Sequence, residues 1–412
     1  MTKKAILRLP LWALLFLTNK LSELPKRNKN KWVFGSHWKR FKDNPKFLML
    51  YVVENHPEIR CIWISHNKKD VGIVRSLGLD CYYWLSIKGA YHCITAGVYI
   101  GDNSISDIND FFAGNALFLD LHHGVGLKKT MWYNLRRQSR ELGISEDNLE
   151  KSFIFKIATY RRLYRKPNLW LATSKAHAED IICPMHRSPL ADCVFGNFPR
   201  NSLLVDDKES ILKLAKKYEP IRTVELIERL KNYNKVYIYM PTWRTDGHDF
   251  VNDSQIDFNK LNTILKINNA VFILNLHPAT KLDYKSLSAL SNIIVFDRII
   301  DVYYILPFTD CLIADYSSVY TDYLIMNKEI ILFPFDYNEY VKKSHDLLDY
   351  DKYYKGMKVY NFNDLLLTIE SNKDCHLSKI DYDTLMDYYW GSINEPLDIV
   401  NEVNKKLECL TL

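Results

Sequence analysis

The chain has 412 residues, of which 47% are apolar, and a formal net charge of +6. This length is enough for two domains with separate cores, and the composition is that of a globular protein, not a disordered one. The charge is too small for the basic surface of a nucleic-acid-binding protein, but it suits an anionic substrate or an acidic membrane surface. The eight cysteines show no paired framework, which is typical of a reducing compartment.

Residues 1–31 form a segment of their own, in which basic residues flank an apolar run at residues 9–17. The run is shorter than the roughly 20 residues that a membrane-spanning helix needs, and no small-residue cleavage site follows it. We therefore expect a helix in the membrane interface with its basic residues on anionic lipid, which places the protein peripherally at the cytoplasmic face of the cell membrane. The alternative is an ordinary core helix with a basic tail.

Short apolar strands alternate with helical segments from residue 32 onward, which predicts a parallel, doubly wound sheet. Strands of the first half are expected at residues 32–35, 59–65, 80–85, 97–101, 117–121, 169–173 and 194–196. They define an N-terminal α/β domain over residues 32–205. A basic amphipathic region at residues 128–165 lies within it.

Residues 206–231 are helical and rich in charge, and we expect them to connect the two halves. The alternation then restarts in a C-terminal α/β domain over residues 232–381. Its strands are expected at residues 236–240, 271–276, 292–296, 312–314 and 330–333. Residues 382–412 are expected to form a helix that crosses back to the N-terminal domain. The predicted fold is α/β, with two doubly wound parallel sheets that face one cleft.

Polar side chains follow several of the expected strands. His123, Arg244, His277 and the pair Ser317–Ser318 each come soon after a strand. Ligands of open parallel sheets bind beyond the carboxyl ends of the strands, so these residues indicate an active site. Each also has a simpler explanation: Ser317 can cap the next helix, Arg244 can form a surface ion pair, and His277 can be an ordinary loop histidine.

The sequence contains neither of the glycine-rich phosphate-binding patterns, Rossmann or Walker A, and no GxSxG or HExxH motif. A nucleotide would therefore be held by hydroxyls, basic side chains and helix N-termini. Two histidines and two cysteines lie between residues 177 and 193, but their spacing does not match a zinc site. We predict no metal or cofactor, although a loosely bound Mg²⁺ is compatible with these residues.

Several motifs resemble, in the same order, those of the CDP-glycerol glycerophosphotransferase family, which includes teichoic acid primases and polymerases and bacterial capsule polymerases. The resembling stretches are residues 43–46, 121–124, 127–129, 198–201, 240–244, 276–278 and 315–319, together with Asp322. They are spread between residues 32 and 360. An ordered set of motifs is far more specific than any one of them.

The resemblance implies a GT-B fold and an enzyme that transfers a polyol phosphate, glycerol phosphate first, from a CDP-polyol to a hydroxyl of a membrane-linked or polymeric acceptor. CMP would be released, in the synthesis of a teichoic-acid-like or capsule polymer. The implied partners are CDP-glycerol or a related CDP-polyol, a lipid-linked or polymer acceptor and an anionic membrane surface, with no nucleic acid.

The resemblance also assigns roles. His123 is the expected general base, because a histidine near pH 7 can take a proton from an attacking alcohol, and His277 is the second expected catalytic residue. The residues expected to bind or orient the donor phosphate are Thr242, Arg244, Ser317, Ser318, Asp315 and Asp322. The residues expected on the acceptor side are His122, Gly124, Lys128 and Lys129, and the two lysines would attract the anionic donor or a polyanionic chain.

Three departures from the family pattern leave the acceptor and the polyol open. His122 stands where the family usually has tryptophan, residues 125–126 replace Thr-Pro, and Ser202 replaces a usual aspartate. A CDP-ribitol ribitolphosphotransferase is therefore an alternative, as is a GT-B glycosyltransferase that uses a nucleotide sugar. A non-catalytic membrane adaptor is a third interpretation, but it would have no need of both His123 and His277.

Overall fold

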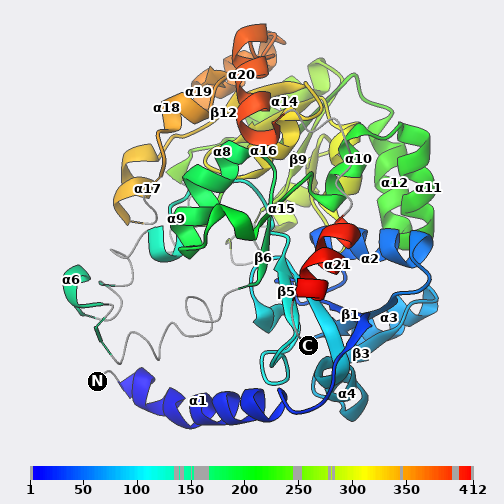
Figure 1. The fold of residues 1–412 in the computed structure, drawn as a ribbon. Helices are drawn as coiled ribbons and strands as arrows, with labels where there is room; N and C mark the ends of the chain where they lie inside the picture. Colours follow the sequence, from blue (N-terminus) through cyan, green and yellow to red (C-terminus); the bar gives the residue numbers. More distant parts are fainter. Residues whose placement is uncertain are drawn as a thin grey trace. The chain divides into compact units, whose positions relative to one another are not determined.

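The computed structural model describes residues 3–133, 139, 143–149, 151–152, 167–244, 253–276, 280, 284–343, 347–391 and 399–409. The chain divides into two compact units (Figure 1). Unit 1 comprises Met1–His123, Thr130–Arg200 and Trp390–Leu412, and unit 2 comprises Gly124–Lys129 and Asn201–Tyr389.

Unit 1 is built on a seven-stranded sheet in the order β3-β2-β1-β4-β5-β6-β7, in which every pair is parallel. The strands are β1 Asn28–Phe34, β2 Arg60–Ser65, β3 Cys81–Tyr83, β4 Ala96–Gly101, β5 Leu117–Asp120, β6 Leu169–Ala172 and β7 Cys193–Phe195. All residues of β4 and β5 are buried, as expected where helices cover both faces of a parallel sheet.

The helices of unit 1 mostly follow these strands in the crossover connections that parallel pairing requires. They are α1 Lys3–Leu21, α2 Asp43–Asn55, α3 Lys68–Ser76, α4 Ile87–Thr95, α6 Glu146–Leu149, α8 Lys175–His177, α9 Cys183–His186 and α21 Ile399–Cys409. Asn67 and Ser86 cap α3 and α4, since their side-chain oxygens accept from backbone N–H groups of the first turn.

Unit 2 contains a six-stranded parallel sheet in the order β10-β9-β8-β11-β12-β13. Its strands are β8 Lys235–Tyr239, β9 Ala270–Leu274, β10 Ile293–Val295, β11 Cys311–Ala314, β12 Glu329–Leu332 and β13 Met357–Lys358. Its helices are α10 Ser202–Val205, α11 Lys208–Tyr218, α12 Ile221–Leu230, α14 Phe258–Ile267, α15 Tyr284–Ser288, α16 Val319–Leu324, α17 Tyr337–Lys343, α18 Tyr350–Tyr353, α19 Phe362–Glu370 and most of α20 Lys379–Trp390.

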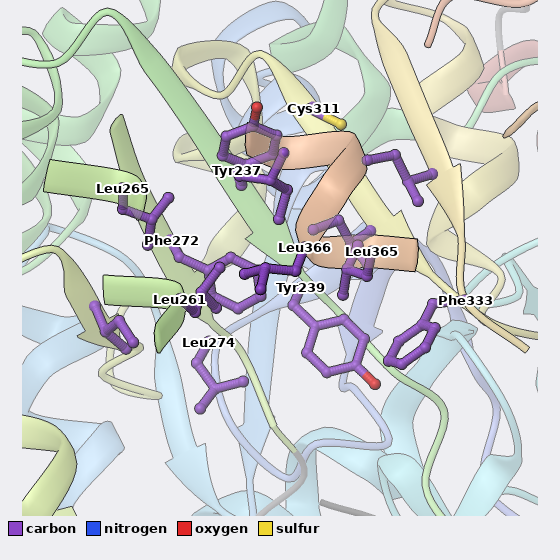
Figure 2. Packing of buried hydrophobic residues seen from close by; sticks show 14 of the residues in the cluster. Tyr237, Tyr239, Leu261, Leu265, Phe272, Leu274, Cys311, Phe333, Leu365 and Leu366 are labelled. Carbon is purple, nitrogen blue, oxygen red and sulfur yellow. The ribbon is translucent and has the colours of Figure 1, made fainter. Parts of the chain in front are cut away.

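The core of unit 2 lies between its sheet and the helices α14 and α19 (Figure 2). Tyr239 and Phe272 of the strands meet Leu261 of α14 and Leu365 of α19, all at most 1% exposed. The apolar spacing of these two amphipathic helices turns one face toward the strands, and this packing fixes the ends of β8 and β11.

The two sheets share one strand order, in which the first strand of each unit (β1 or β8) pairs with the fourth (β4 or β11). The connections leave this point in opposite directions, and ligands of doubly wound folds bind there, beyond the carboxyl ends of the strands. In unit 1 the chain leaves these strands at Gly35 and Asp102, and in unit 2 at Met240 and Asp315. In each unit, this end of the sheet is therefore the place where a ligand is expected.

The predicted pair of doubly wound parallel sheets is confirmed, and each expected strand overlaps an observed one. The sequence missed β13, which has only two residues. The helices at residues 206–231 belong to unit 2, and α21 belongs to unit 1, where Lys29 Nζ donates to the carbonyl of Leu407 at 3.0 Å. Most of the basic region at residues 128–165 lies outside the described residues.

Candidate active site

The backbone after β5 is held in an unusual conformation at His122, whose φ of 56° lies in the left-handed region. A non-glycine residue adopts this region only when its surroundings compensate for the strain. Two buried side chains do so: Asp120 Oδ1 accepts from the backbone N–H of His122 at 2.8 Å, and Asn44 Nδ2 donates to its carbonyl at 2.7 Å. The direction in which the chain presents His123 is thereby fixed.

Asn44 is itself held by a segment far along the chain. Its Oδ1 accepts from the backbone N–H of Arg200 at 3.3 Å, and the guanidinium of Arg200 forms a buried ion pair with Asp43. Asp43 also accepts from Trp38 Nε1 at 3.1 Å. Residues 43–46 and 198–201, which the sequence linked only through the family resemblance, therefore support the same loop.

His123 lies with Nδ1 3.2 Å from the backbone carbonyl of Asp102. A carbonyl oxygen can only accept, so Nδ1 carries the proton and Nε2 keeps a free lone pair in the neutral ring. The ring of His37 lies beside it, with 4.7 Å between the ring centroids. This tautomer is the one that a general base acting through Nε2 requires.

The pKa of His123 is lowered from its ordinary value to about 4, first by desolvation and then by His37, whereas Asp102 and Asp43 act in the opposite direction. The side chain is nevertheless exposed to solvent, and contact with water favours the charged form. A pKa below that of free histidine therefore follows, without the full shift that complete burial would cause. His123 is neutral at physiological pH.

His37 and Asp102 were not identified from the sequence, although they occupy the point in unit 1 where β1 and β4 pair. Asp102 is fully buried, accepts from the backbone N–H of His37 at 2.7 Å and from Ser36 Oγ at 2.9 Å, and lies 3.1 Å from His37 Nδ1. Burial and the neighbouring Asp43 raise the pKa of Asp102 well above its usual value. The signal that could have found them is their place directly after these two strands.

His122 does not fit its expected acceptor-side role. Its side chain is only 7% exposed, and its ring packs against Trp170 and His186, with centroid distances of 5.5 and 5.4 Å. Desolvation lowers the pKa of His122 to about 4. The ring therefore serves as packing in unit 1, in the position where the family pattern has tryptophan.

Arg244 of unit 2 is 3% exposed and pairs with two carboxylates. Its Nη1 lies 2.8 Å from Asp315 Oδ2, while Nε and Nη2 donate to the two oxygens of Asp336 at 2.7 and 2.8 Å. Tyr316 also donates its hydroxyl to Asp336, at 3.1 Å. Arg244 thus ties together the segments that follow β8, β11 and β12.

The hydroxyls near Arg244 remain available. Ser317 and Ser318 are partly exposed, and Ser318, which precedes α16, makes no capping hydrogen bond, so capping does not explain the pair. Thr242 Oγ1 is buried and has no hydrogen-bond partner among the described residues. Asp322 is fully buried and accepts from the hydroxyl of Tyr303 at 2.5 Å, which fits its expected role in orienting the loop.

The expected acceptor-side residues Gly124, Lys128 and Lys129 belong to unit 2, although His123 belongs to unit 1. Thr321 Oγ1 donates to the carbonyl of Val125 at 2.9 Å. The segment Gly124–Lys129 is therefore attached to the helix that follows Ser318. The other expected catalytic residue, His277, lies outside the described residues.

One group that could ligate a metal lies in this part of unit 1: ligand atoms of His37, Asp43 and Asp102 are all within 4.8 Å of one another. Asp43 is already neutralised by Arg200, and the raised pKa of Asp102 favours its protonated form. Metals bind deprotonated ligands. The donor set therefore does not fit a metal well, and no step below uses one.

Two doubly wound parallel sheets with ligand positions at the ends of their first and fourth strands define a GT-B-like α/β protein. The solved structure of the wall teichoic acid polymerase TagF has this fold and is similar with a TM-score of 0.71 and 19% identity, covering 99% of this chain and 97% of that one. A family model described as CDP-glycerol:poly(glycerophosphate) glycerophosphotransferase matches residues 17–388. The chain belongs to this family.

Relatives named for both ribitol and glycerol polymers are similar in sequence. The teichoic acid ribitol-phosphate polymerase TarL of Staphylococcus aureus is 30% identical over 152 residues, which cover 35% of this chain and 26% of TarL. The teichoic acid poly(glycerol phosphate) polymerase of Bacillus subtilis is 24% identical over 375 residues, which cover 88% of this chain and 45% of that protein. The chain thus matches less than half the length of either polymerase.

Proposed function

We propose that the protein transfers glycerol phosphate from CDP-glycerol to a hydroxyl of a teichoic-acid-type acceptor and releases CMP. The chain belongs to a family of such transferases. The observation that carries the proposal is that Nδ1 of His123 is hydrogen-bonded to a backbone carbonyl, which leaves Nε2 to accept a proton. CDP-ribitol is the second candidate donor, because TarL, a relative at 30% identity, is named for ribitol phosphate.

The proposed reaction is a displacement at the phosphorus that carries the polyol. The acceptor oxygen forms the new bond to phosphorus while its proton moves to Nε2 of His123, and the bond from this phosphorus to the CMP oxygen breaks. Negative charge develops on the phosphoryl oxygens and on CMP, and fixed donors stabilise it. Unit 2 supplies these donors through Thr242, Ser317 and Ser318, and His277 is proposed from the family resemblance to assist them.

A CMP-release assay tests this function. Purified protein is incubated with CDP-glycerol, CDP-ribitol or a nucleotide sugar, together with an oligomeric or lipid-linked polyol-phosphate acceptor. We expect CMP from CDP-glycerol, in proportion to acceptor extension. Release of CMP from CDP-ribitol alone would identify ribitol phosphate as the transferred group. Release of UDP or GDP from a nucleotide sugar would contradict the proposal and indicate sugar transfer.

We expect the acid limb of kcat/KM to lie below pH 6.5. The base must be neutral, so activity falls only as pH drops through the pKa of His123, which is lowered. Replacing His37 with glutamine removes a neighbour that lowers this pKa, and the acid limb should move to higher pH. Initial rates between pH 4.5 and 8.5 measure both curves, and identical limbs in the two proteins would contradict the assignment.

We also propose that the protein associates peripherally with an anionic membrane through α1. None of the described helices is both long and apolar enough to cross a bilayer. Leu14, Leu17 and Leu21 of α1 are 50–57% exposed, and their spacing places them on one face of the helix, whereas Leu15 is buried. An exposed apolar face beside basic residues favours the interface of an anionic membrane.

The double substitution Leu14→Asp/Leu17→Asp should weaken binding to phosphatidylglycerol-containing vesicles by about tenfold or more, since two leucines that enter the membrane interface contribute strongly to the free energy of binding. Co-sedimentation measures it. Ile267→Asp is the matched control, because Ile267 is 77% exposed but lies in α14 of unit 2. Equal binding by all three proteins would remove α1 from the membrane contact.

A further inference from the structure

We infer that Lys128 is the cation that binds the donor phosphates, and that Arg244 instead holds the surrounding loops in place. The family resemblance placed Lys128 on the acceptor side and Arg244 on the donor phosphate, so both assignments change. The inference rests on the proposed function and adds the residue that recognises the diphosphate of the CDP-polyol.

The first observation is the attachment of the Lys128 segment to unit 2. The backbone N–H of Leu348 donates to the carbonyl of Leu127 at 2.8 Å, and Lys128 forms an antiparallel bridge with Leu347. On the other side, Thr321 donates to the carbonyl of Val125. Lys128 is thus fixed by backbone contacts on both sides, within the unit that carries Arg244 and Ser318.

The segment also passes close to Ser318. A Cβ built on Gly126 would lie 3.5 Å from Cβ of Ser318, which is ordinary van der Waals contact. Lys128 follows two residues later in the chain. A lysine, two partly exposed serines and the orphaned hydroxyl of Thr242 are groups that suit the oxygens of a diphosphate.

The second observation is the balance of charge around Arg244. Its guanidinium is buried and already engaged by Asp315 and Asp336, so a phosphate could contact it only by displacing a carboxylate. Lys128 interacts electrostatically with Asp315 and Arg244, yet no described residue forms an ion pair with it within 4 Å. Because Asp315 and Asp336 both pair with Arg244, Lys128 is the cation with which an incoming anion can pair.

Burial supports this assignment. Desolvation lowers the pKa of Lys128 to about 8, with Arg244 acting in the same direction and Asp315 in the opposite one. A bound phosphate would raise this pKa by favouring the charged form. A partly desolvated ammonium is therefore better placed to bind an anion strongly than a fully solvated lysine.

Calorimetric binding of cytidine, CMP and CDP to the full-length protein tests the inference. Lys128→Met should weaken CDP binding at least about tenfold while cytidine affinity stays within about twofold, because only the phosphates lose their cation. Lys128→Arg should retain most of the CDP affinity. Lys342→Met is the control, because Lys342 is an exposed lysine of α17 in the same unit.

The pH dependence gives a second readout. CDP affinity of the unmodified protein should fall as pH rises from 7 to 9.5, since Lys128 loses its charge, and Lys128→Arg should remove this fall. The charged groups that face Lys128 are Arg244, which stays protonated, and Asp315. The Lys128→Arg protein keeps both groups in place, so loss of the fall in this variant assigns it to Lys128.

The outcomes distinguish a failure of the role assigned to Lys128 from a failure of the proposed function. Unchanged CDP affinity in Lys128→Met, in a protein that releases CMP normally, would overturn the role of Lys128 and leave the proposed function intact. Loss of CDP binding in Lys129→Met but not in Lys128→Met would overturn it as well. A wild-type protein that binds no cytidine nucleotide would overturn both.

Discussion

Replacing His123 with alanine is expected to lower kcat by about 10²–10⁴-fold, the usual contribution of a general base. The physical reason is the hydrogen bond from Nδ1 to the carbonyl of Asp102, which leaves Nε2 as the proton acceptor. The affinity for CDP should change little, because no donor-binding role is assigned to unit 1. CMP release and nucleotide binding, measured on the same preparation, separate the two effects.

His56→Ala is a matched control for this experiment. His56 is another histidine of unit 1, lies at the end of α2, and contacts Glu58 at 3.2 Å. It should retain full activity. A His123→Ala protein with unchanged kcat would mean that another group takes the proton, whereas a protein with lost CDP affinity would mean that His123 binds the donor.

Replacing Arg244 with methionine should destabilise the protein by about 3–5 kcal/mol, because it leaves Asp315 and Asp336 without their buried partner. Both carboxylates pair with Arg244 at less than 3 Å. Urea-induced unfolding at pH 7.5 measures the effect.

Two variants serve as comparisons for Arg244→Met. Arg222→Met breaks an ion pair with Asp297 whose members are 65% and 35% exposed, and such surface pairs contribute roughly 0–1 kcal/mol. Adding Asp336→Asn to Arg244→Met should recover part of the lost stability. A stable Arg244→Met protein that has lost CDP binding would show that Arg244 contacts the phosphates after all.

The parallel sheets could be predicted because their central strands are continuous apolar runs. Ala96–Gly101 and Cys311–Ala314 are buried along their whole length, and this pattern follows from helices on both faces. The boundary of the first strand differs: the sequence predicts a start at Trp32, whereas β1 starts at Asn28, with polar, exposed residues that carry no strand signal.

The candidate site was predicted only in part, because proximity in space depends on strand order. Ser317, Ser318 and Thr242 could be found as polar residues after strands. Nothing in the sequence marks His37 and Asp102 as neighbours, since they are brought together by the pairing of β1 with β4. Burial of His122 was also out of reach, because a histidine followed by a second histidine gives no indication of what surrounds its ring.

The division of the chain has a practical consequence for protein engineering. The polypeptide passes between the units at His123/Gly124, Lys129/Thr130, Arg200/Asn201 and Tyr389/Trp390, so no linear fragment consists of one whole unit alone. A fragment that starts at Asn201 lacks the strip Gly124–Lys129, and one that ends at Arg200 lacks α21. Isolating either half therefore calls for grafting or circular permutation, and truncation should yield aggregation-prone products with exposed core.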